Sequence, residues 1–135
     1  MAKKTTNKTF NRSDAALEVS LAIPAAAANG QTAALDLESG AGNCELLLSV
    51  PALANLASTK TVSAKIQESA DNATFADAAW APALTITGES SGGGKAGELR
   101  LAIPSNAKRY IRAYVATAAD GGNNTASKLT LSAKF

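Results

Sequence analysis

The chain has 135 residues, a net charge of +2, no histidine and a single cysteine, Cys44. This length corresponds to one domain, and the lack of histidine excludes Ser-His-Asp and Cys-His catalysis and most transition-metal sites. Apolar residues make up 46% of the chain but aromatic residues only 4%, so we expect a core of Ala and aliphatic side chains that buries little area per residue.

The N-terminus is predicted to be an extended basic arm over residues 1–13, followed by one β-sandwich domain over residues 14–135. Without the four cations of the arm, the rest of the chain carries a charge of −2. Such a charge distribution does not predict binding to nucleic acid. No apolar run is long enough to span a bilayer, and the arm lacks the apolar stretch of a signal peptide. The arm residues expected to contact a partner are its basic and aromatic side chains: Lys3, Lys4, Lys8, Arg12 and Phe10.

Short runs of alternating apolar and polar residues follow the arm, and Pro, Gly, Asn or Asp residues separate them. This period-2 alternation predicts half-buried strands. We expect strands at residues 17–23, 33–38, 44–50, 61–69, 84–87, 98–103, 110–117 and 128–135.

The segments between these strands also carry local signals. Asn29-Gly30 predicts a turn, and residues 51–57, with Pro51 at the first position, predict a short helix. Residues 88–97 predict a flexible glycine-rich loop. About eight short strands separated by turns indicate an all-β, antiparallel jelly roll or β-sandwich. The abundant Ala favours helices, but Pro and Gly divide the chain too finely for long ones.

The glycine-rich loop has the spelling G-x-G-x-x-G at residues 92–97. A dinucleotide site needs a helix after the last glycine, so that the helix N-terminus meets the pyrophosphate. The residues that follow alternate as a strand does, and Ala96 stands where a phosphate-binding loop of the Walker type has Ser or Thr. We therefore predict no nucleotide site and no cofactor.

Acidic residues cluster between residues 68 and 77. Asp71, Asn72 and Asp77 have the chemistry of a turn, because Asp and Asn side chains bond to their own backbone. A hard cation would need more oxygen ligands than this turn offers. If the chain were an enzyme, its best candidates would be Glu68, Asp71 and Asp77, but nothing in the sequence pairs them. We predict no catalytic activity.

The strand at residues 110–117 places Tyr110, Arg112 and Tyr114 on one face and apolar residues on the other. Tyr and Arg are enriched at protein–protein interfaces. The stripe could instead be a solvated sheet face, or it could stack on a sugar or on single-stranded nucleic acid. The near-neutral body offers little attraction for phosphate.

Two segments, IQESADNATFADAAW at residues 66–80 and IPSNAKRYIRAYV at residues 103–115, resemble the cement (decoration) proteins on the capsids of tailed bacteriophages, in particular the Bordetella-phage type. The resemblance covers most of residues 17–135. It implies a jelly-roll-like fold, no catalytic residues and a location on the outer capsid surface of the virion, after synthesis in the bacterial cytoplasm. The implied partners are the major capsid protein and the chain itself, as a homodimer or homotrimer.

Two further functions stay open from the sequence. One is a lyase or hydrolase that uses the acidic residues named above. A carbohydrate- or receptor-binding sandwich of a phage fibre or head appendage has the same pattern of strands. That function predicts glycan binding by the isolated protein, with loss of binding on Tyr114→Ala.

Overall fold

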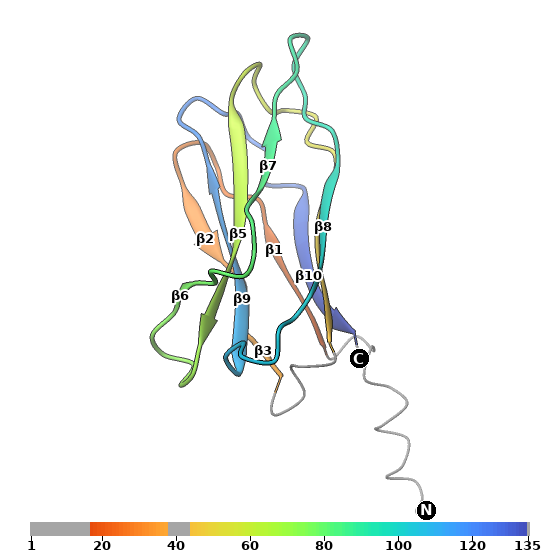
Figure 1. Ribbon diagram of the computed structural model, residues 1–135. Coiled ribbons are helices and arrows are strands. Elements are labelled where there is room, and N and C mark those ends of the chain that lie inside the picture. Colours follow the sequence, from red (N-terminus) through yellow and green to blue (C-terminus); the bar gives the residue numbers. More distant parts are fainter. Residues whose placement is uncertain (1–16, 38–43, 135) are drawn as a thin grey trace, which may run out of the picture.

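The computed structural model describes residues 17–37 and 44–134, which form two antiparallel sheets packed face to face (Figure 1). The strands are β1 (Glu18–Ala22), β2 (Asn29–Gln31), β3 (Leu35–Asp36), β4 (Glu45–Val50), β5 (Thr61–Ser69), β6 (Ala76–Asp77), β7 (Leu84–Thr87), β8 (Gly97–Ala102), β9 (Tyr110–Thr117) and β10 (Lys128–Lys134). Among these described residues, no helix is long and apolar enough to cross a membrane.

The order of the strands is that of a jelly roll. One sheet has the order β1-β10-β4-β8, and the other has the order β2-β9-β5-β6, with β3 also on β9 and β7 also on β5. The chain crosses repeatedly between the sheets as it runs from β1 to β10, with β2–β3 and β5–β7 consecutive in the second sheet. This strand order is that of the jelly roll with its two Greek keys. The predicted antiparallel jelly-roll sandwich is confirmed.

Apolar residues at every second position of the sequence are the residues that the strands bury. In β9 every second residue is buried, and β4 and β10 follow the same rule. The two inner faces meet in one core of aliphatic side chains and Ala. Cys44, with 5% of its surface exposed, is part of this core, as expected for a small apolar side chain.

Residues 51–57 do not form the predicted helix. Leu53 forms an isolated bridge with Gly94, in which each N–H donates to the other residue's carbonyl oxygen at 2.9 Å. The carbonyl of Leu56 accepts a hydrogen bond from the N–H of Gly93 at 2.8 Å. Pro51 favours a helix start locally, but pairing with a distant segment and burial of both leucines outweigh that preference.

The glycine-rich segment that binds residues 53–56 has a defined path, in contrast to the flexible loop predicted from its composition. The N–H of Glu89 donates to the carbonyl of Gly93, and the N–H of Gly92 donates to the carbonyl of Glu89, both at 2.8 Å. A Cβ atom on Gly94 would lie 2.7 Å from Cγ2 of Ile86. The glycine is therefore required by close packing.

The turn predicted at Asn29-Gly30 is also wrong, because both residues belong to β2 and pair with β9. The chain reverses earlier, where Ala27 has a φ of 63° and the N–H of Ala28 donates to the carbonyl of Ala25. Thr32 separates β2 from β3, and its hydroxyl accepts a hydrogen bond from the N–H of Ala113 at 3.1 Å. Of the predicted strand at residues 33–38, only Leu35–Asp36 forms β3, and residue 38 lies outside the described residues.

Candidate binding interface

The outer face of the sheet β2-β9-β5-β6 gathers aromatic and charged side chains from three segments of the chain. Tyr110, Arg112 and Tyr114 alternate with buried residues along β9. The strand register places Lys65 opposite Tyr114 and Gln67 opposite Arg112. We call this surface the tyrosine face, and its members are Lys65, Gln67, Phe75, Asp77, Tyr110, Arg112 and Tyr114.

A chain of hydrogen bonds runs across the tyrosine face. Arg112 Nε donates to Gln67 Oε1 at 2.9 Å, and Gln67 Nε2 donates to Asp77 Oδ1 at 3.1 Å. Lys65 Nζ donates to Asp77 Oδ2 at 3.0 Å. The bond from Lys65, and then the bond from Gln67, lower the pKa of Asp77. Because the Lys65 and Asp77 side chains are 39% and 59% exposed, the pair adds little to stability, but it fixes the positions of both side chains.

Each aromatic ring of the tyrosine face has a cation beside it. Arg112 Cζ lies 3.9 Å from the centroid of Phe75, and Lys65 Nζ lies 5.2 Å from that of Tyr114. Arg109 Cζ lies 5.1 Å from the centroid of Tyr110. These distances fall within the range of cation–π attraction. Rings and cations are therefore held in one arrangement before any partner arrives.

The turn that carries Phe75 onto this face is organised by two side chains. Asp71 Oδ1 accepts hydrogen bonds from the N–H groups of Ala73 (2.9 Å) and Thr74 (3.1 Å), and from the Ser69 hydroxyl (2.8 Å). Ser69 Oγ in turn accepts from the N–H of Asn72 at 3.0 Å, and Asn72 has a φ of 60°. The predicted turn role is confirmed for Asp71 and Asn72 but is wrong for Asp77, which belongs to β6 and binds Lys65 and Gln67.

The hydrogen bonds of this turn keep the Asp71 carboxylate ionised at acidic pH. The backbone N–H groups of Thr74 and Ala73, and then the Ser69 hydroxyl, lower the pKa of Asp71 from 3.8 to about 2. A lowered folded-state pKa means that the stabilisation is present above pH 3.8 and is lost as the pH falls through about 2. In an NMR titration, the Asp71 carboxyl carbon should show its midpoint near pH 2. A midpoint near 3.8 would show that the turn does not hold the carboxylate.

Glu68 turns to the other side of the same sheet, where the strand register places it opposite the buried Ile111. Its Oε1 atom accepts hydrogen bonds from Trp80 Nε1 at 3.1 Å and from the N–H of Lys108 at 3.0 Å. The carboxylate therefore joins three segments at one end of the sandwich, and this gives Trp80 a structural role.

The three carboxylates considered for catalysis do not form a pair in the structure. Glu68 faces inward, Asp71 is bound within its turn, and Asp77 is bound to Lys65 and Gln67. In the part of the chain that the structure describes, no group of three or more His, Cys, Asp or Glu side chains could hold a metal ion.

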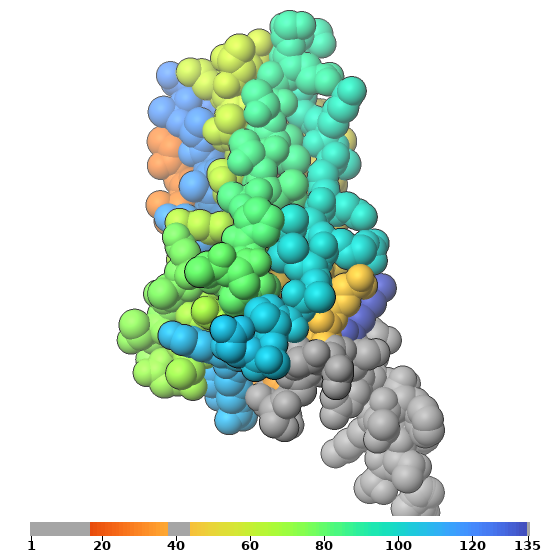
Figure 2. All heavy atoms as spheres, viewed as in Figure 1, coloured from red at the N-terminus to blue at the C-terminus, as the bar shows by residue number. Residues whose placement is uncertain are grey.

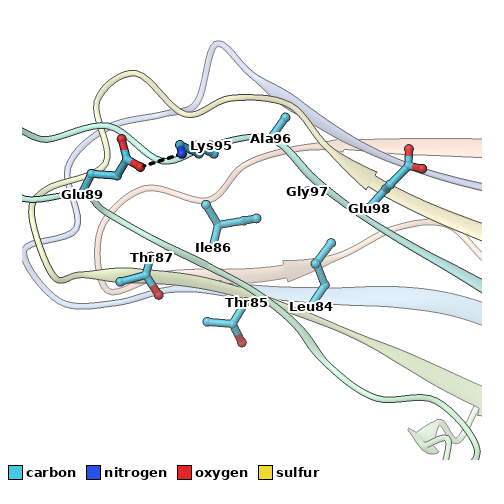
Figure 3. Close-up of a pocket in the computed structure, with 9 residues that line it drawn as sticks. All are labelled: Leu84, Thr85, Ile86, Thr87, Glu89, Lys95, Ala96, Gly97 and Glu98. Carbon is cyan, nitrogen blue, oxygen red and sulfur yellow. Dashed lines mark ion pairs between the residues drawn. The ribbon is translucent and has the colours of Figure 1, made fainter.

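A shallow groove of ≈ 300 Å³ lies between β7 and the start of β8. Leu84 and Ile86 point into it toward residues 95–98, and Lys95 pairs with Glu89 at its rim at 3.5 Å (Figure 3). The glycine motif continues into strand β8, not into a helix. The strand predicted after the last glycine is therefore confirmed, and the helix N-terminus that a pyrophosphate would meet is not formed at this place.

The structure brings the predicted Tyr110, Arg112 and Tyr114 together on one surface. The other predicted contact residues, Lys3, Lys4, Lys8, Phe10 and Arg12, lie outside the described residues. Sequence reasoning did not assign Phe75, Asp77 or the two β5 residues to the tyrosine face. Lys65 and Gln67 occupy outward positions of β5, but only the register of β5 against β9 shows that they meet the tyrosines.

Comparison with known sequences places the chain among phage proteins. A model of Bbp16, a Bordetella phage protein family, matches residues 17–133, and the match fits a phage structural protein. No protein among the curated sequences matches the chain.

Solved structures also align with the chain. PBSX exported protein XepA aligns with a TM-score of 0.54 at 14% identity, over 84% of this chain and 34% of the XepA chain. This chain therefore spans about a third of XepA. A CBM4 structure aligns at 0.41 (12% identity, 76% and 56% covered), and Family 16 Carbohydrate Binding Module-2 at 0.39 (9% identity, 82% and 73% covered).

Proposed function

Since the chain belongs to the Bbp16 family, we propose that it is a virion protein that binds the outer surface of the major capsid protein shell and stabilises the junctions between capsomers. Its fold supports this proposal, because jelly rolls are common in virus particles. The described residues contain neither a paired set of catalytic carboxylates nor a metal-binding cluster. A role in binding is in keeping with this chemistry.

The observation that carries the proposal is the tyrosine face. Tyr and Arg are enriched among the interface residues whose truncation costs most binding energy. Here Gln67 and Asp77 already hold Arg112 and Lys65 in place. The face therefore loses little side-chain entropy when it meets a rigid shell.

Stabilisation of a shell by such a protein is additive over many copies. Each copy that spans a capsomer junction adds noncovalent contact area, and internal pressure must break all of these contacts together. The basic arm would extend the distance over which each copy can contact the shell by about 3.3 Å per extended residue. Deletion of residues 2–12 is therefore expected to reduce the number of copies on the capsid without unfolding the sandwich.

Sugar binding on this face is less favoured by the geometry. A glycan that stacks on a tyrosine needs an open ring face, and Lys65 lies over Tyr114 while Arg112 lies over Phe75. A sugar on those ring faces would have to displace the cations and break their bonds to Asp77 and Gln67. Contact with a protein surface leaves the rings, the cations and their hydrogen bonds in place.

Single substitutions on the tyrosine face test the proposal. Arg112→Ala and Tyr114→Ala should each weaken binding to assembled capsids about tenfold or more, as expected at interface hot spots. Lys128→Ala is a matched control, because Lys128 is exposed on β10, in the opposite sheet. Binding is measured by sedimentation of capsids with added protein. Equal binding of all three variants would remove the tyrosine face from the function, and glycan binding lost on Tyr114→Ala would favour the alternative.

A further inference from the structure

The arginines that the structure describes differ in whether they have a carboxylate partner. Arg109 Nε and Nη2 donate to the two carboxylate oxygens of Asp36 at 2.7 and 3.0 Å. Arg100 Nη1 lies 3.3 Å from Glu45 Oε1. Arg112 is the third of these arginines, and it forms no ion pair with any described carboxylate.

The guanidinium of Arg112 keeps most of its hydrogen-bonding capacity. A guanidinium carries five N–H donors, and the Nε donor of Arg112 is bound to Gln67 Oε1 at 2.9 Å. The N–H groups on its two terminal nitrogens have no acceptor among the described residues. Parallel N–H groups of a guanidinium match the two oxygens of a carboxylate. Arg112 can therefore bind a carboxylate and keep its bond to Gln67.

This guanidinium has a fixed place on the tyrosine face. Arg112 lies between Tyr110 and Tyr114 on the same side of β9, and its Cζ is 3.9 Å from the centroid of Phe75. The turn at residues 70–75 lies at the surface of the molecule, in light green at the lower left of the space-filling view (Figure 2). Arg112 is partly buried, whereas the side chains of the other two described arginines are 51% and 50% exposed. Its charge has therefore lost part of its water before any partner docks.

The other charges around the tyrosine face are already paired. Lys65 binds Asp77 at 3.0 Å, and Arg109 binds Asp36. Among these side chains the positive charge of Arg112 is left without a counter-charge. A nucleic acid places many phosphates at short intervals, so it would also approach the carboxylates of Asp36 and Asp77. A single acidic side chain can instead contact Arg112 alone.

We infer that Arg112 determines the specificity of the tyrosine face, and that the protein surface docked there presents an Asp or Glu side chain to its guanidinium. This inference rests on the proposed docking of the tyrosine face. A surface that covered Arg112 without an acceptor would remove water from its N–H groups and leave them unbonded, which is unfavourable. A carboxylate replaces that water with charge-assisted hydrogen bonds. The unpaired guanidinium therefore rejects partner surfaces that lack an acid at this position.

Substitutions that remove or keep the charge of Arg112 test the inference, with sedimentation of capsids as the measurement. Arg112→Gln should weaken binding about 30-fold or more, because the carboxylate of the partner is then buried without its cation. Arg112→Lys keeps the charge but not the two parallel donors, so it should recover only part of the affinity. Lys128→Gln makes the same change in net charge on the opposite sheet and should bind as the wild-type chain does. Circular dichroism checks that each variant is folded.

Chemical modification of the capsid tests the other half of the contact. Treatment with a carbodiimide and glycinamide converts exposed carboxylates of the capsid into neutral amides. This treatment should weaken binding of the wild-type chain and of Tyr114→Ala by the same large factor, because both retain Arg112. It should weaken binding of Arg112→Gln much less, since that variant no longer uses the carboxylate. An equal factor for all three proteins would overturn the inference.

The same measurements separate a failure of this inference from a failure of the proposed function. If Tyr114→Ala weakens binding and Arg112→Gln binds as Lys128→Gln does, the tyrosine face docks without an acidic partner residue, and only the inference is wrong. If neither Tyr114→Ala nor Arg112→Gln weakens binding, the tyrosine face is not the docking surface, and the proposed function and the inference are both wrong.

Discussion

Replacement of Leu48 by Ala is expected to lower the free energy of unfolding by ~3–5 kcal/mol. Leu48 is completely buried on β4, between Leu131 of β10 and Leu99 of β8. Removing its side chain loses transfer free energy and leaves a cavity, because the backbones of both neighbouring strands are fixed by the ladder. Few aromatic side chains are present to fill the space. Urea unfolding followed by circular dichroism measures the loss.

Leu47 provides the matched control for this prediction. It is the preceding residue on the same strand, but it points to the outer face and is partly exposed. Leu47→Ala should therefore cost less than about 1 kcal/mol, since the truncated side chain leaves no closed cavity. An equal loss for the two substitutions would contradict the assignment of inner and outer faces on β4.

Gly122→Ala is expected to cost about 2–5 kcal/mol. Gly122 has a φ of 91°, and a Cβ atom there would lie 2.1 Å from the backbone oxygen of Asn55. Backbone atoms cannot rotate away as side chains do, so the two loops would have to separate. Their separation would strain the hydrogen bonds from Asn55 N–H to Asn124 Oδ1 and from Ala57 N–H to the Gly121 carbonyl, both 3.0 Å long.

Gly92→Ala separates the effect of the close contact from that of backbone conformation. Gly92 has a similar φ of 86°, but nothing lies within 4 Å of its Cβ position. This substitution should cost only about 1 kcal/mol, from the unfavourable positive φ alone. Thermal unfolding of both variants checks the difference. Equal losses would show that the loop contact at Gly122 is unimportant.

The strands were predictable because their signal is local. In β9 and β10, apolar residues at every second position coincide with the buried face, so the sequence alone indicated both the element and its orientation. These features depend only on the period of a pleated strand.

The predictions that were wrong concern segments whose structure depends on a partner far away in the sequence. The helix expected after Pro51 is replaced by the bridge from Leu53 to Gly94, and the turn expected at Asn29-Gly30 is replaced by pairing with β9. Neither partner can be identified from local propensity. In both places the chain gains backbone hydrogen bonds to a distant segment.

The candidate interface was only partly predicted, because some of its residues meet through contacts between distant segments. Tyr110, Arg112 and Tyr114 follow from the alternation within one strand. Phe75 reaches Arg112 only because the turn at Asp71 folds over the sheet, and Asp77 joins Lys65 and Gln67 only through the register of β6 on β5. A single sequence contains no information on such registers.

Electron cryo-microscopy of the native phage particle tests the central claim most directly. Our account predicts density for this jelly roll on the outer surface of the capsid, at the junctions between capsomers, with the side chains of Tyr110, Arg112 and Tyr114 in contact with the major capsid protein. A particle whose outer shell lacks this density, or in which the tyrosine face points to solvent, would contradict it.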